Sequence, residues 1–213
     1  MGTAERELAE ARLREAILRG DLLPGQRLVE AELVELFGVS RNRVRLAIDA
    51  LAGEGLVERS PNRGARVRKV STAEAIEIIE CRVALESLIA RKAADRITPA
   101  EAARLREQLV AMRQAVADGE LLKYSALISQ LHELIRLAAR QATAAELIER
   151  LQAQIVRHQF QLSLRAGRPQ RSLTELADLV AAVTGRSPDR AEAAARRHLE
   201  RVVAELAADG GVQ

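Results

Sequence analysis

The 213-residue chain is long enough for two modest domains, and its 48% apolar and 30% charged residues exclude a disordered chain. A single cysteine, Cys81, excludes an intrachain disulfide and suits a reducing cytoplasm, and no segment approaches the roughly 20 apolar residues of a membrane span. With two Phe, one Tyr and no Trp, the core must be built from aliphatic side chains, which favours closely packed helices and argues against single-strand binding by aromatic stacking.

Positive charge is concentrated in one part of the chain, although the net charge is only +3. Residues 38–69 hold eight basic and three acidic residues, whereas the remainder is nearly balanced. A local basic patch on a balanced chain is typical of nucleic-acid binding.

The apolar pattern predicts three helices in the first 55 residues, over residues 5–19, 30–37 and 41–54. Gly38 ends the second helix and Ser40 caps the third, so these two form a helix-turn-helix. We expect the inner face of the third helix to pack against Leu33 and Leu36. That inner face consists of Val44, Ala47, Ile48 and Leu51.

A β-hairpin is predicted after the helix-turn-helix, because residues 56–59 and 65–68 alternate around the turn residues 60–64. A hairpin in this place reads as a wing. We therefore predict a winged helix-turn-helix domain over residues 1–70.

Duplex DNA is the predicted partner of this domain. Arg41 and Arg45 are four residues apart on one face at the start of the third helix, where such helices meet base edges, and arginine matches guanine in the major groove. The hairpin tip is placed to approach the backbone or the minor groove. The candidate DNA-contacting residues are Arg41, Asn42, Arg43, Arg45, Arg63 and Gly64.

The chain after residue 70 is predicted to be an all-α domain over residues 71–213, so the fold class is mainly α. A capping box at Ser71-Thr72-Ala73-Glu74 opens its first helix, and Thr98-Pro99-Ala100-Glu101 caps the second, with Pro at the first helical position. The first of these runs to about residue 96, and four more are expected over residues 121–139, 144–165, 172–183 and 188–207. Six helices are enough to bury a core.

The first domain resembles the GntR family of bacterial transcription regulators through LREAILRGDLLPGQRLVEAELVELFGVSRNRVR and LAGEGLVERSPNRGARV. The family's helix usually reads Ser-Arg-Thr-Pro-Val-Arg-Glu-Ala-Leu. The resemblance implies that Arg41 and Arg45 act on DNA. Asn42, Arg43 and Leu46 depart from the pattern, so the operator sequence is expected to differ.

The second domain resembles the helical FCD ligand-binding domain of the FadR-type branch, through residues 80–86, Leu131-His132 and Arg197-His198-Leu199. This resemblance implies a homodimer and a pocket for an organic acid or similar metabolite. Many members also hold a divalent metal through one Asp and three His. Two of these positions here are Ile128 and Leu176, and two imidazoles alone fall short of a usual zinc site, so we predict no metal and no other cofactor.

Three residues are candidate ligand contacts: Arg82, His132 and His198. Arg82 either pairs with Glu86 four residues away or binds a ligand carboxylate. The two histidines are core residues satisfied by neighbours, polar groups of a metal-free pocket, or a weak two-histidine metal site. These alternatives stay open at the level of sequence.

The sequence thus predicts a cytoplasmic, DNA-binding transcriptional regulator, by default a repressor, whose operator affinity changes when a small molecule binds the helical domain. Two rivals are a metal-dependent enzyme and a regulator whose helical domain only dimerises. Scattered histidines and the loss of the Asp and one His argue against the enzyme, whereas the apolar replacements keep the non-sensing regulator open.

Overall fold

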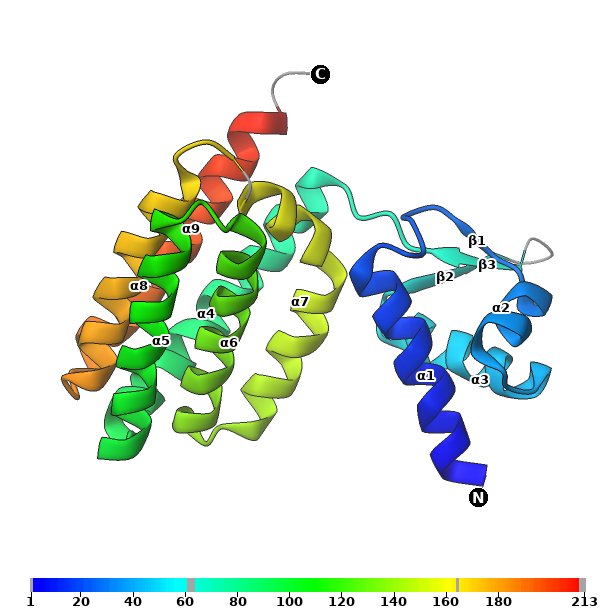
Figure 1. Cartoon of the computed structure of the whole chain (residues 1–213), viewed down its shortest axis with the longest axis horizontal. Helices are drawn as coiled ribbons and strands as arrows, with labels where there is room; N and C mark the ends of the chain where they lie inside the picture. Colours follow the sequence, from blue (N-terminus) through cyan, green and yellow to red (C-terminus); the bar gives the residue numbers. More distant parts are fainter. Residues whose placement is uncertain (1, 61–63, 164, 211–213) are drawn as a thin grey trace. The chain divides into compact units, whose positions relative to one another are not determined.

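The computed structural model describes residues 2–60, 64–163 and 165–210, which form two compact units. Met1–Ser71 and Gln152–Val156 belong to the first unit, and Thr72–Leu151 with Arg157–Gln213 form the second. Figure 1 shows both units with their helices and strands labelled. Among the described residues, no helix combines the length and the apolar character that a membrane crossing requires.

The first unit is a winged helix-turn-helix. Its elements are α1 (Gly2–Arg19), β1 (Arg27–Leu28), α2 (Glu30–Phe37), α3 (Arg41–Gly53), β2 (Val57–Ser60) and β3 (Gly64–Val67). The three strands form an antiparallel sheet in the order β1-β3-β2, and Val57 pairs with Val67 at the base of the β2–β3 hairpin. Strand β1, which the sequence analysis missed, pairs through Arg27 with Arg66.

Helices α2 and α3 meet at a tight turn around Gly38. Gly38 adopts the left-handed conformation (φ 63°), and its N–H donates to the carbonyl of Val34 at 2.9 Å. Ser40 occupies the N-cap position of α3 as predicted, but its side chain makes no capping hydrogen bond; its backbone carbonyl accepts from the N–H of Val44 at 3.1 Å.

One predicted core contact of this unit is wrong. Leu36 is 65% exposed, whereas Phe37 is 6% exposed and joins Leu33 in the core. Residues four apart lie on one face of a helix, so Leu33 and Phe37 point inward together and Leu36 falls outside that face. The predicted inner face of α3 is buried in full.

The second unit is a bundle of helices, and none of its described residues forms a strand. Its helices are α4 (Thr72–Arg96), α5 (Pro99–Ala117), α6 (Leu121–Ala139), most of α7 (Ala142–Ser163), α8 (Arg168–Thr184) and α9 (Pro188–Gly210). Helix α4 packs against α6, α8 and α9 (Figure 1). The core is aliphatic, apart from Met112 and a buried Tyr124 whose hydroxyl lies 2.5 Å from the Oγ of Ser172.

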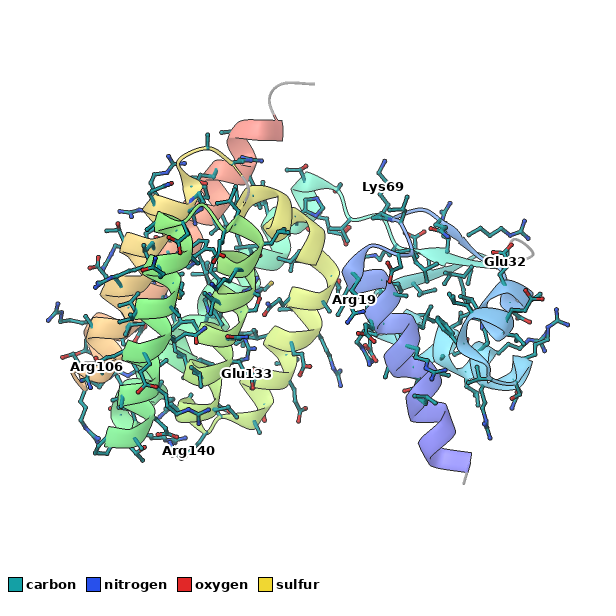
Figure 2. All side chains as sticks on the ribbon, in the orientation of Figure 1. Arg19, Glu32, Lys69, Arg106, Glu133 and Arg140 are labelled. Carbon is teal, nitrogen blue, oxygen red and sulfur yellow. The ribbon has the colours of Figure 1, made fainter. Side chains whose placement is uncertain are left out.

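The start of α5 follows its predicted cap, whereas α8 begins earlier than predicted. The Thr98–Glu101 capping box is formed at the start of α5, and Arg140, labelled in Figure 2 at the end of α6, donates to Oε1 of Glu101 at 2.9 Å. Helix α8 begins at Arg168 rather than at residue 172, because Pro169 falls in the first turn, where a missing N–H costs nothing.

Candidate functional site

The start of α3 presents two exposed arginines on one face. Arg41 and Arg45 have side chains that are 64% and 56% exposed, and both lie against the carboxylate of Glu30 at the start of α2. Nε of Arg45 donates to both Glu30 oxygens, at 2.8 and 3.0 Å, and Nε of Arg41 lies 3.1 Å from Oε2. The inner face of α3 fixes this orientation, because burying Val44 and Ile48 turns residues 41 and 45 outward.

The electrostatics of this surface favour the charged forms of Glu30 and Arg45. The hydrogen bond from Arg45 lowers the pKa of Glu30 below its usual value of 4.5, and the same bond raises the pKa of Arg45. The cluster therefore carries two positive charges and one negative charge at neutral pH, which leaves it attractive to a polyanion.

The other predicted DNA contacts differ in exposure. Asn42 is exposed, Arg43 is half-buried and Gly64 is exposed at the start of β3 with φ +79°. Arg63 falls outside the described residues. A further residue joins the hairpin to α3: Nε of Arg59 in β2 lies 2.6 Å from Oδ1 of Asp49.

A first buried polar cluster lies between α4 and α6. Arg82 is 2% exposed and donates through Nε to Oε1 of Glu86 at 3.0 Å, and also through Nη2, so the i, i+4 pair expected from the sequence is present. Nδ1 of His132 lies 3.2 Å from the other oxygen of Glu86. Burial alone raises the pKa of a carboxyl, but the charges of Arg82 and His132 outweigh it and hold the pKa of Glu86 well below 4.5.

A second cluster joins α8 to α9. Nδ1 of His198 lies 2.7 Å from Oε2 of Glu175, which also accepts from Arg168 at 3.3 Å and, through Oε1, from Arg201 at 3.2 Å. Burial acts to raise the pKa of Glu175, but the bond from His198 and the charge of Arg168 lower it to about 2. Burial lowers the pKa of His198, so the ring is neutral at pH 7 and donates through Nδ1.

The two clusters face one another through their histidines. The ring centroids of His132 and His198 lie 6.0 Å apart with the planes tilted by 34°. A pocket beside His132, lined by Glu86, Arg136 and Leu179 among others, has room for about one water molecule. Nη1 of Arg82 and Nη1 of Arg136 are buried without a hydrogen-bond partner among the described residues.

Comparison with known proteins identifies the family. Residues 5–67 match the gntR family of bacterial regulatory proteins, and residues 77–201 match the FCD domain. The chain is 32% identical over 173 residues to the HTH-type transcriptional repressor RspR of Escherichia coli K12, covering 81% of this chain and 76% of that protein. This chain belongs to the GntR family, in the group with an FCD domain.

Further relatives of this GntR-family chain agree with that placement. It is 30% identical over 114 residues to a probable D-xylose utilization operon transcriptional repressor of Paenarthrobacter nicotinovorans, covering 54% of this chain and 50% of that protein. Its fold is similar to that of E. coli McbR/YncC, with a TM-score of 0.81 at 22% identity over 96% of this chain and 97% of the other.

A GntR regulator from Rhodococcus sp. RHA1 gives a TM-score of 0.72 at 22% identity, covering 97% of this chain and 99% of the other. At this level of identity, these structures establish the fold. The predicted family and fold class are confirmed, and the GntR-family chain is a DNA-binding transcriptional regulator rather than an enzyme.

The metal site implied by the FCD resemblance does not fit this GntR-family chain. His132 and His198 come close together, but Ile128 and a fully buried Leu176 occupy the other two positions. The Nδ1 atoms of both histidines face carboxylates, and no three metal-ligating side chains converge anywhere in the described residues. Aliphatic side chains cannot coordinate, and two imidazoles fall short of the ligand number that a tight site requires.

Sequence reasoning missed the carboxylates that organise these sites. The sequence analysis gives Glu86 as a partner of Arg82 but not of His132, and it assigns no role to Glu175. Glu30 was not considered at all. Spacing within one helix reveals the Arg82–Glu86 pair, whereas the other contacts join residues of different helices and depend on packing.

Proposed function

We propose that this GntR-family protein is a homodimeric repressor whose affinity for a pseudo-palindromic operator changes when a small organic acid binds the FCD domain. The observation that carries the DNA part is the exposed pair Arg41 and Arg45 on α3, next to a β-hairpin. We assign residues 1–70 to operator binding and residues 71–213 to effector binding and dimerisation. We place the protein in the cytoplasm with its operator.

The chemistry of α3 supports base reading. Two guanidinium groups four residues apart, at the N-terminal end of a recognition helix, match adjacent guanines in a major groove. Asn42 and Arg43 flank the pair and are assigned further contacts there. Gly64, at the start of β3, and Arg63, which precedes it in the sequence, are assigned to the backbone or the minor groove. A dimer presents two such helices to half-sites about one helical turn apart, roughly 10 base pairs.

The buried charges of the FCD domain support an anionic effector. Arg82 and Glu86 lie in the interior although removing charges from water is costly, and a buried guanidinium group is suited to an anionic ligand. Buried guanidinium nitrogens without partners are rare, and a carboxylate is the group that satisfies them best. We therefore assign Arg82, His132 and His198 to effector binding, without a metal.

Repression is proposed because two relatives are themselves named repressors, the HTH-type transcriptional repressor RspR and the probable D-xylose utilization operon transcriptional repressor. A dimeric repressor responds to an effector when the ligand binds the DNA-competent and DNA-incompetent arrangements with different affinity. The names of these relatives do not identify the effector of this protein.

Selection from a pool of random duplexes tests the DNA part. Full-length protein is expected to enrich an inverted repeat, and light scattering of the complex is expected to show two chains per duplex. An enriched pool without sequence preference, or one chain per duplex, would contradict the proposal.

A thermal-shift screen against small carboxylic acids tests the effector part. A true effector raises the melting temperature through binding to the folded state and changes operator affinity in an anisotropy titration. An acid that raises the melting temperature without any change in operator affinity would contradict the proposed regulation.

A second candidate is a regulator that no longer senses a ligand. The narrowness of the pocket beside His132 and the burial of Leu176 favour it, because side chains fill the space that a metabolite would need. Under this alternative, no acid in the screen changes the melting temperature, while operator selection succeeds.

A further inference from the structure

One carboxylate contacts both arginines that we assign to base reading. Glu30 is the first residue of α2, and its oxygens lie 2.8 Å from Nε of Arg45 and 3.1 Å from Nε of Arg41. The helix-turn-helix geometry brings these residues together, because α2 starts beside the N-terminal half of α3. A glutamate in the first helical turn is also favoured by the helix dipole.

The contacts leave the reading edge of each arginine available. A guanidinium group has five N–H donors in one plane, and the hydrogen bonds from Arg45 to Glu30 use Nε alone. Among the described residues, the terminal nitrogens of Arg45 make no hydrogen bond to protein. Those nitrogens can still form a bidentate contact with guanine.

The position of Glu30 is costly for general attraction to DNA. A carboxylate beside two arginines removes part of the positive charge that phosphates attract. The pairs also contribute little to stability, because both arginines are more than half exposed and exposed ion pairs are weak. Glu30 does restrict the rotamers of Arg41 and Arg45 before DNA binds, so the two side chains lose less conformational entropy on binding.

We infer that Glu30 is a positioning residue for sequence reading: it holds Arg41 and Arg45 side by side and raises discrimination between DNA sequences while lowering general affinity for DNA. The inference rests on the proposed base-reading role of the two arginines. A carboxylate of this kind acts before the complex forms, by restricting the orientations that the guanidinium groups adopt in the free protein.

The test compares Glu30→Gln with Glu35→Gln in the full-length protein. Glu35 lies on the same helix, is exposed, and has no ion pair among the described residues, so both variants lose one negative charge. Anisotropy titrations at one salt concentration use the operator selected by the wild-type protein and a scrambled duplex of equal length and composition. Thermal melting shows that both variants are folded.

We expect Glu30→Gln to lower operator affinity about tenfold, comparable to weakening one bidentate base contact, while affinity for the scrambled duplex rises. Glu35→Gln is expected to leave the ratio of the two affinities unchanged. An unchanged ratio of the two affinities would overturn the inference. If both affinities change by the same factor, Glu30 acts only through its charge; if neither changes, Glu30 has no role in binding.

Different results would refute the base-reading role of Arg45 and the positioning role of Glu30. If the wild-type protein does not distinguish operator from scrambled DNA, or if Arg45→Ala leaves that distinction intact, the base-reading assignment fails. If Arg45→Ala abolishes the distinction and Glu30→Gln does not, only the positioning role fails.

Discussion

Arginine–glutamate pairs in this protein differ in energy according to their burial. The pairs of Glu30 with Arg41 and Arg45 are exposed, and such pairs contribute between 0 and about 1 kcal/mol to stability. The pair of Arg82 with Glu86 is buried, and removing one partner of a buried pair typically costs about 3–5 kcal/mol. The exposed pairs are therefore free to serve DNA recognition, and the buried pairs hold the interior of the FCD domain in one arrangement.

Arg45→Ala tests the base contact at the level of one side chain. We expect specific operator binding to weaken by about 1–3 kcal/mol, with a broader choice of sequences, because a bidentate contact is lost. The measurement is an anisotropy titration on the selected operator and on single-base variants of it. Arg106→Ala is the matched control, since Arg106 is exposed in the helical unit (Figure 2) and removes the same charge. Equal effects of the two substitutions would refute the assignment.

Glu175→Gln tests the second buried cluster. The free energy of unfolding is expected to fall by about 3 kcal/mol at pH 7, because the buried Arg168 loses its fully buried carboxylate partner and keeps, among the described residues, only the partly exposed Glu205. The pKa of Glu175 is lowered from 4.5 to about 2 in the folded protein. Its stabilisation is therefore full above about pH 4.5 and disappears as the pH falls towards 2.

Urea unfolding of wild type and Glu175→Gln between pH 2 and pH 7 measures this difference. The stability gap between the two proteins should narrow below about pH 4.5. Glu107→Gln, at an exposed position, serves as control and should match the wild type. A gap that is constant over the whole range would contradict the ionised, paired state of Glu175.

At the scale of elements, the sequence predicted what depends on local signals. The bounds of α2 and α6 were predicted to the residue, because a glycine and the helical periodicity define them. The start of α8 was placed four residues too late, because the helix already begins before Pro169, and a proline is tolerated in its first turn. Strand β1 has two residues, which is too short for an alternation pattern.

The polar contacts also divide into those that local spacing predicts and those that depend on packing. The Arg82–Glu86 pair follows from spacing within α4, whereas the partner of His198 lies on another helix. Contacts of that second kind depend on how helices pack, which periodicity alone does not specify. The side chains that α2 buries depend on which face of the helix turns inward. The prediction placed Leu36 on that face, whereas the structure buries Phe37 instead.

Phe37→Ala and Leu36→Ala test the corrected face of α2. Loss of the buried ring should cost about 3–5 kcal/mol of unfolding free energy, whereas loss of the exposed leucine should cost no more than about 0.5 kcal/mol. Urea unfolding followed by circular dichroism measures both, in the full-length chain. Similar costs for the two substitutions would show that α2 packs with a different face.

At the scale of the whole molecule, regulation requires that binding at one site changes the affinity at the other. Typical couplings of about 1–3 kcal/mol change affinity 5- to 150-fold, and the effect is reciprocal. An effector that weakens operator binding must therefore itself bind less tightly when the operator is present. Titrations of effector into the protein, with and without bound operator, measure this reciprocity.

Metal content tests the predicted loss of the family's metal site. Purified full-length protein is expected to hold well below one equivalent of zinc, nickel or manganese per chain, because Ile128 and Leu176 cannot act as ligands. Elemental analysis after dialysis measures this content, and added Zn²⁺ should leave the melting temperature unchanged. One equivalent retained after dialysis would refute the prediction.

The buried phenol of Tyr124 has a practical consequence for spectroscopy. The chain has no tryptophan and no other tyrosine, so ultraviolet emission excited in the tyrosine band comes from this one ring. Its hydroxyl lies against Ser172 inside the bundle, so loss of that environment changes the signal when the bundle melts. Emission thus follows the FCD domain alone, while circular dichroism follows the helices of both units, and comparing the two curves shows whether the two parts of the chain unfold together.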